Sequence, residues 1–343
     1  MIPGTDGWGG LRSASNRSKE RDSSMMQVLL IGLGAGAAAA LLFASVASGS
    51  PISVVLFYLA PLPILIAALG WSHWAALVAA VAAAAGLAVV FNSYFFITFL
   101  VAIGLPAWWL GYLALLARPV EGVPGGLEWY PAGHLVVWAA ILGAVVASIG
   151  ILYISTDEAS LRAQARELVE RAYRIAGRLQ PDGTPMADAG RVADLMLALL
   201  PPTAAVFTTA TTVLNLWLAS RVVRISGRLN RPPPDLSAMR FPIYAPALIG
   251  AAVAASFLPG MIGSFGVALS ASMLLAYAIL GLAVMHAITR GMNSRPFALG
   301  GLYAAVIVFQ WPMLLLSMLG LADTAFDLRG RAARRRGPPN PQT

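Results

Sequence analysis

Polar side chains inside apolar segments are the first candidates for chemistry, because a buried polar group needs a hydrogen-bond partner. Asn215 shares one helical face with Thr208, Thr211 and Thr212. Threonine hydroxyls can bond to carbonyls of their own helix and need no ligand. The amide of Asn215 needs further partners. We therefore take Asn215 as the strongest ligand-binding candidate among these four residues.

Prolines mark two further candidate regions. Tyr58 precedes Pro61 and Pro63 inside an apolar segment, where proline removes backbone hydrogen bonds. Carbonyls freed in this way are tolerated inside a membrane where they face protein or a water-filled cavity. The region is either a cavity wall or a plain kink in a helix. The same two interpretations apply around Pro106.

Aromatic and amide side chains complete the candidate ligand set. Trp108 and Tyr112 follow Pro106, and they either stack on a ligand or belong to an interfacial aromatic belt. We favour the belt, because tryptophan and tyrosine are enriched at the edges of membranes. Asn92 lies in a short polar break between two apolar segments. The set of expected ligand-binding residues is Tyr58, Asn92, Trp108, Tyr112, Asn215 and His286.

His286 stands one helical turn before Arg290, which suggests a gating or coupling residue near a membrane surface. The three histidines, His73, His134 and His286, lack a second ligand at metal spacing, so we expect no metal site and no cofactor. The chain has no cysteine and none of the sequence motifs of hydrolases or nucleotide-binding proteins. We expect no catalytic residue and no enzymatic activity.

Small residues at a spacing of four form one face of the first apolar segment: Gly32, Gly36, Ala40 and Ala44. Such a face lets another helix approach closely. The occupant is either a partner subunit or another helix of the same chain. We favour packing within the chain, because small residues are abundant throughout it.

The charged residues, 11% of the sequence, are confined to short clusters. Between the clusters lie stretches with no Asp, Glu, Lys or Arg, and these are residues 23–117, 129–156, 195–220, 241–289 and 296–322. An ionised side chain at the centre of a bilayer costs about 2.5–3.5 kcal/mol. The pattern therefore predicts an integral membrane protein. The net charge of +8 then indicates membrane topology and contact with lipid headgroups, and we expect no nucleic-acid partner.

A spanning helix needs about 20 apolar residues, which predicts an all-α bundle of transmembrane helices. The nine candidate segments are 26–47, 52–69, 73–91, 94–117, 132–154, 203–223, 243–258, 263–288 and 297–319. Residues 1–24 are expected to be a disordered extension and residues 321–343 a basic disordered tail. Spans one to five fall in residues 25–154 and spans six to nine in residues 201–320. Residues 155–200 are expected to be an extracytoplasmic amphipathic helical hairpin, which covers its own helices or docks a partner.

Arginine and lysine in short loops predict orientation, because they stay in the cytoplasm. The basic residues before the first span predict a cytoplasmic N-terminus. We expect the protein to reside in the inner (plasma) membrane of the cell. Three complete spans after Arg240 would put Arg329 and the arginines beyond it outside. We therefore expect eight full spans and one irregular or re-entrant segment, 243–258, which is short and interrupted by prolines.

Four segments resemble the YybS-like family of uncharacterised bacterial membrane proteins, which would cover residues 25–321. They are residues 25–32, residues 60–63, residues 104–112 and residues 281–287. The family is in turn similar to the substrate-binding S-components of energy-coupling-factor transporters. The resemblance implies that Gly32, Gly36, Ala40 and Ala44 contact a transmembrane coupling subunit. This chain has more helices than an S-component and an added external hairpin.

Three functions are compatible with these features. The leading hypothesis is a substrate-binding or accessory subunit of an uptake system, which takes an unidentified small molecule and relies on other membrane subunits for energy. The second is a scaffold for envelope assembly that acts through the external hairpin. The third is a self-sufficient transporter or channel.

Overall fold

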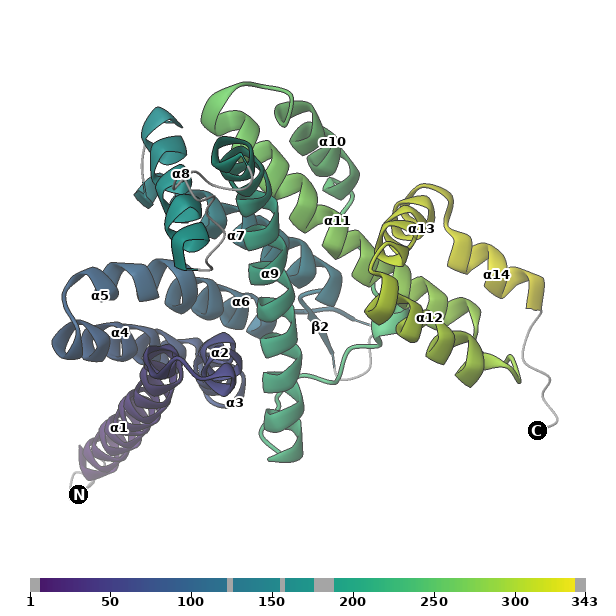
Figure 1. The fold of residues 1–343 in the computed structure, drawn as a ribbon. Helices are drawn as coiled ribbons and strands as arrows, with labels where there is room; N and C mark the ends of the chain where they lie inside the picture. Colours follow the sequence, from purple (N-terminus) through teal and green to yellow (C-terminus); the bar gives the residue numbers. More distant parts are fainter. Residues whose placement is uncertain (1–6, 122–125, 155–157, 176–187, 337–343) are drawn as a thin grey trace, which may run out of the picture. The chain divides into compact units, whose positions relative to one another are not determined.

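The computed structural model describes residues 7–121, 126–154, 158–175 and 188–336. The described part is almost entirely helical (Figure 1), so the all-α expectation is confirmed. The helices are α1 (Gly7–Ala44), η1 (Ser45–Ser48), α2 (Pro51–Tyr58), α3 (Pro61–Gly70), α4 (His73–Val90), α5 (Tyr94–Phe99), η2 (Leu100–Gly104), α6 (Leu105–Leu115), α7 (Ala132–Ile154), α8 (Glu158–Ile175), α9 (Ala189–Ile225), η3 (Leu236–Ala238), α10 (Ala245–Ala255), α11 (Gly260–Ile288), α12 (Arg295–Phe309), α13 (Pro312–Phe326) and α14 (Leu328–Arg336). Two short strands, β1 (Ala117–Pro119) and β2 (Leu127–Trp129), pair antiparallel.

Seven helical segments of the described chain are long and apolar enough to cross a membrane. They are Met25–Ser48, Pro51–Gly70, His73–Val90, Tyr94–Leu115, Ala132–Tyr153, Ala189–Ile225 and Gly260–Ile288. Three shorter apolar helices, α10, α12 and α13, follow or flank the last of these. The polytopic membrane fold predicted from the charge pattern is therefore confirmed.

The chain divides into two compact units. One consists of Met1–Trp129 together with Leu214–Pro232, and the other of Tyr130–Val213 together with Pro233–Thr343. We call them unit 1 and unit 2. The helix α9 contributes to both units, because the division falls within it.

Unit 1 is held together by close approaches of small residues. A side chain at Gly36 would place its Cβ 2.7 Å from the carbonyl oxygen of Ala79, so α1 and α4 are nearly in backbone contact there. Gly32 faces the carbonyl of Ala75 in the same way. The small-residue face of α1 is therefore covered by α4 of the same chain, and Gly32 and Gly36 are not free to dock a partner. Ala40 and Ala44 on this helix are half-buried.

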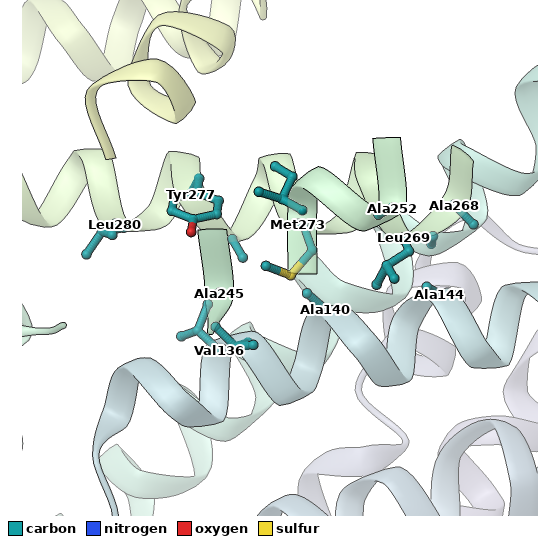
Figure 2. Close-up of a cluster of buried hydrophobic side chains, with 14 of the residues drawn as sticks. Val136, Ala140, Ala144, Ala245, Ala252, Ala268, Leu269, Met273, Tyr277 and Leu280 are labelled. Carbon is teal, nitrogen blue, oxygen red and sulfur yellow. The ribbon is translucent and has the colours of Figure 1, made fainter. Parts of the chain in front are cut away.

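Unit 2 is built around α11, which packs against α7, α10 and α13. Figure 2 shows the apolar side chains of α11, including Met273 and Leu269, facing Val136 and Ala140 of α7. On another side of α11, Gly281 and Gly320 bring α11 and α13 so close that a Cβ on either glycine would overlap the opposite backbone. The hydroxyl of Ser317 donates a hydrogen bond to the carbonyl of Leu274 across this contact (2.7 Å).

Within the amphipathic segment expected at residues 155–200, the described residues form α8 and the first turns of α9, and residues 155–157 and 176–187 lie outside the described residues. Ala165 and Val169 of α8 share a small buried cluster with Ala189 and Ala193 of α9. The boundary expected at residue 200 is absent, because α9 continues for 37 residues through Pro201 and Pro202. An interior proline removes its own N–H hydrogen bond and crowds the carbonyl four residues before it, so a helix end at this point would have been the ordinary outcome.

Three further elements differ from the sequence-based expectation. First, α1 begins at Gly7, within residues expected to be disordered. Second, the segment 297–319 is not one span but two helices, because Gln310 adopts a φ of 58° and Pro312 begins α13. Third, the chain after residue 321 continues as α13 and α14. Residues 337–343 lie outside the described residues.

Candidate functional site

The break between α2 and α3 lies where the sequence placed a cavity wall or a kink. In a regular helix the N–H of Leu62 would donate to the carbonyl of Tyr58. Here it donates to Leu59 instead (2.9 Å), because Pro61 and Pro63 interrupt the pattern. The carbonyl of Tyr58 is therefore released from its own helix.

Asn215 supplies the missing donor. Its Nδ2 donates to the carbonyl oxygen of Tyr58 at 2.8 Å, and the side chain is 1% exposed. Two residues that were selected independently from the sequence therefore lie together in unit 1. The neighbouring threonines follow the interpretation given to them, since Thr209 and Thr211 both donate to carbonyls of their own helix.

The region around Pro106 contains a second backbone irregularity. Leu100–Gly104 forms a π-helical turn, η2, between α5 and α6. Such turns are rare and occur frequently at functional sites. Gly104 permits close contact here, because a Cβ at this position would lie 3.1 Å from the Cβ of Ala80. The spans that contain Pro61 and Pro106 are thus both irregular near their prolines, and both belong to unit 1.

Trp108 and Tyr112 belong to an aromatic group near the ends of α3, α4 and α6. Their rings are stacked with centroids 6.2 Å apart, and His73 lies edge-on to Tyr112 at 5.3 Å. Two residues before His73, the ring of Trp71 is covered by the guanidinium of Arg228, whose Cζ lies 4.8 Å from the ring centroid. This arrangement of rings and arginine at helix ends is typical of an interfacial belt.

Arg231 binds the end of α6 in the same unit. Its Nη1 donates to the carbonyl of Ala114 in the last turn of that helix (3.0 Å). A cation at a helix C-terminus is stabilised by the helix dipole. Burial nevertheless lowers the pKa of Arg231 from its usual value, because desolvation disfavours the charged form.

The remaining two sequence candidates have local roles in the described chain. The Oδ1 of Asn92 accepts a hydrogen bond from the N–H of Tyr94 (2.9 Å) at the beginning of α5, which is an Asx turn. His286 on α11 is hydrogen-bonded through Nε2 to the hydroxyl of Tyr303 on α12 (2.8 Å). Neither residue is placed with Tyr58 and Asn215 by any contact that we describe.

A group of arginine–carboxylate pairs in unit 2 was not singled out from the sequence. Arg290, just beyond α11, pairs with both oxygens of Asp235 at 3.1–3.2 Å and donates to the hydroxyl of Ser237. Hydrogen bonds from Ser237 and from Arg290 lower the pKa of Asp235 below its usual value. Asp235 therefore remains ionised through mildly acidic pH, and the pair with Arg290 persists there.

The most buried ion pair that we describe joins Asp323 and Arg329, whose side chains are 4% and 10% exposed. The guanidinium of Arg329 also donates to the carbonyl of Ser237 (2.8 Å). Both charged residues fall in the segment 321–343, for which the sequence predicts a disordered tail. The available signal was the end of the last uncharged stretch at residue 322, directly before Asp323.

These contacts bring the ends of several helices together on one side of unit 2. The end of α11, the segment around η3 and the beginning of α14 meet at Arg290, Ser237 and Arg329. The backbone of Arg240 also passes directly over Gly133 at the beginning of α7. The pair α10 and α11 therefore leaves this side and returns to it, and the pair α12 and α13 does the same.

Charge-free apolar helices, interfacial aromatic residues and arginine-capped helix ends together define a polytopic helical membrane protein. The chain belongs to the family described as predicted membrane protein (DUF2232), whose model matches residues 37–324. No curated protein and no solved structure matches the chain.

Proposed function

We propose that this protein is a substrate-binding or accessory membrane subunit that captures a small molecule in unit 1. The observation that carries the proposal is the hydrogen bond from Asn215 to the released carbonyl of Tyr58 at the break between α2 and α3. Membrane transport proteins commonly build binding sites from discontinuous helices, where backbone carbonyls become available to a ligand. The π-helical turn η2 adds a second irregular span to the same unit.

The proposal includes dependence on partner proteins for energy. Residues 23–117 contain no aspartate, glutamate, arginine or lysine, so the first four apolar spans, within residues 25–115, have no Asp or Glu proton relay of their own. Similarity to S-components of energy-coupling-factor transporters remains part of the proposal. Because α4 covers Gly32 and Gly36, a coupling subunit would have to bind a different surface.

We further propose that the arginine-rich helix ends lie in the cytoplasm and that the protein resides in a bacterial inner membrane. The support is that Arg290 and Arg329 meet on one side of unit 2, and the positive-inside rule then assigns that side. Three complete spans after Arg240 would have placed Arg329 and the arginines beyond it outside. Because α10 with α11 and α12 with α13 each leave the cytoplasmic side and return to it, these arginines stay in the cytoplasm. Both termini are cytoplasmic in this arrangement.

The test uses full-length protein purified gently from native membranes into nanodiscs. Native mass spectrometry should detect a retained small molecule, and the Asn215→Leu variant should lose it. The matched control is Thr211→Val on the same helix, because the Thr211 hydroxyl donates to carbonyls of its own helix, those of Phe207 and Thr208. Co-purification of an energy-supplying subunit is expected with the wild type.

Two outcomes would count against this function. Equal retention by wild type, Asn215→Leu and Thr211→Val would remove the assigned site. Uptake by the purified chain alone in liposomes would favour a self-sufficient transporter or channel instead.

The scaffold function has its own supporting observation. Leu168 and Ile175 of α8 and Leu199 of α9 are 54%, 82% and 61% exposed, although the segment is amphipathic and has its own buried cluster. Exposed apolar side chains at this density favour a covering partner or the bilayer surface. Loss of envelope integrity with unchanged uptake after removal of residues 157–194 would support the scaffold.

A further inference from the structure

Unit 2 contains a cavity of about 340 Å³ where α11 ends. Its wall includes Ala287 in the last turn of α11 and the side chains of Ser237, Arg240, Arg290 and Arg329. No aspartate or glutamate is among the described residues that line it. Three arginines on the wall of a cavity without a carboxylate make a site for an anion.

The carboxylates that pair with these arginines are not among the residues that line the cavity, and their side chains are 53% and 42% exposed. Asp235 holds Arg290 and Asp327 holds Arg240, the latter through a single contact of 3.1 Å from Nη2. A guanidinium has five N–H donors on three nitrogens. Within the described chain, each of these two contacts engages one terminal nitrogen of its arginine. Arg240 and Arg290 therefore retain donors for a ligand, and the carboxylates fix the direction in which each side chain points.

Arg329 has a different part in this site. Its guanidinium is nearly buried against Asp323 and the carbonyl of Ser237, so its hydrogen-bonding capacity is largely used within the protein. It holds the beginning of α14 against η3 and thereby closes one wall of the cavity. The rest of α14 carries Arg331 and Arg334 and no acidic residue, which raises the positive potential around the opening.

The position of the cavity indicates where its ligand comes from. Ala287 belongs to a 29-residue apolar helix long enough to span a bilayer, and Arg290 lies just beyond its end. Lipid phosphates lie at this level of a membrane, and arginines there are attracted to anionic lipids. We propose that Arg240 and Arg290 bind the phosphate of an anionic lipid headgroup in this cavity. This site is separate from the ligand site proposed in unit 1.

The test measures lipid retained by the full chain after delipidation in detergent. Phosphatidylglycerol is added back, and native mass spectrometry counts the bound molecules. The double variant Arg240→Gln and Arg290→Gln should bind phosphatidylglycerol about 100-fold more weakly, since a hydrogen bond to a charged group contributes about tenfold for each arginine. Arg329 is left intact in all variants, because its loss would leave Asp323 buried without a partner.

The matched control is the double variant Arg331→Gln and Arg334→Gln, which removes the same charge from exposed positions on α14. It should retain the lipid to within about threefold. Equal loss in both double variants would overturn the proposal and leave only a general attraction of positive charge to the membrane. Unchanged binding in the Arg240 and Arg290 variant would overturn it as well.

A second arm distinguishes a lipid phosphate from a soluble one. The chain is placed in nanodiscs of phosphatidylcholine, and inorganic phosphate is added while thermal unfolding is followed. Stabilisation by phosphatidylglycerol without stabilisation by inorganic phosphate is the expected result. Stabilisation by inorganic phosphate alone, lost in the Arg240 and Arg290 variant, would overturn the lipid assignment and identify a soluble phosphate compound as the ligand.

Discussion

At the scale of single residues, two polar side-chain contacts each stabilise a break between consecutive helices. The amide of Asn215 replaces a hydrogen bond that proline removed from the α2–α3 break. The pair Asp323 and Arg329 fixes the joint between α13 and α14, where Asp327 adopts a left-handed conformation. The side chains of Asn215, Asp323 and Arg329 are buried, so any of them that loses its partner has little access to water in its place.

Replacement of Asn215 by alanine should destabilise the protein by about 1–3 kcal/mol, because it removes the buried amide that donates to the carbonyl of Tyr58. The measurement is unfolding of the purified protein by denaturing detergent. Thr211→Val should change stability by less than about 0.5 kcal/mol. A loss for Thr211→Val as large as that for Asn215→Ala would contradict this account.

Asp323→Asn should destabilise the protein by about 3–5 kcal/mol, since it leaves Arg329 as a buried uncompensated charge. The double variant Asp323→Leu with Arg329→Met should recover most of that loss, because it removes both charges together. Denaturant unfolding of the two variants decides the matter. If the double variant is as unstable as Asp323→Asn, the pair is not the source of the effect.

At the scale of elements, the sequence predicted the apolar helices well and their ends less well. The spans could be located from the sequence because the free-energy cost of placing a charged side chain in the bilayer depends on the residue type alone. The continuation of α9 through Pro201 and Pro202 runs against the usual effect of proline, so its beginning was not predicted. The break at Gln310 was missed although Pro312 was a local signal for it. The contact of Asn215 with Tyr58 was likewise beyond prediction, because it joins residues 157 positions apart, although each residue was a candidate by itself.

The close approach of α1 and α4 makes opposite predictions for two neighbouring glycines. Gly36→Ala should destabilise by about 1–3 kcal/mol, because the new Cβ would meet the backbone of α4. Gly34→Ala should be neutral or stabilise by up to about 1 kcal/mol, since open space surrounds Gly34 and alanine favours the helix. Thermal unfolding in detergent compares them. The same sign for both substitutions would refute the packing argument.

The break between α12 and α13 contains a residue in a conformation that glycine adopts more easily. Gln310 has a φ of 58° and a ψ of −37°. Gln310→Gly should therefore stabilise the protein by about 1 kcal/mol, whereas Gln310→Ala should give no gain. Paired melting curves provide the comparison. A loss of stability with glycine would mean that the glutamine side chain contributes more than its backbone costs.

At the scale of the whole molecule, the arrangement of arginines predicts an even number of passages between the two ends of the chain. The chain has no cysteine, so single cysteines can be introduced without background labelling. Ser226→Cys, Ser294→Cys and Arg334→Cys should be protected from a membrane-impermeant maleimide in intact cells. Ser93→Cys and Ala159→Cys should react. Labelling of Arg334→Cys in intact cells would show that the C-terminal helices cross an odd number of times.

The sharing of α9 between the two units imposes an order on biosynthesis. Unit 1 is completed only when Leu214–Pro232 has been made, long after α1 to α6 have left the ribosome. At about 5–20 residues per second, the carbonyl of Tyr58 waits roughly 8–30 s for Asn215 to be synthesised. During that interval the first six helices are exposed in the bilayer as an incomplete intermediate. Chaperoning at the membrane, by an insertase or by lipid, is therefore most needed before the last part of α9 emerges.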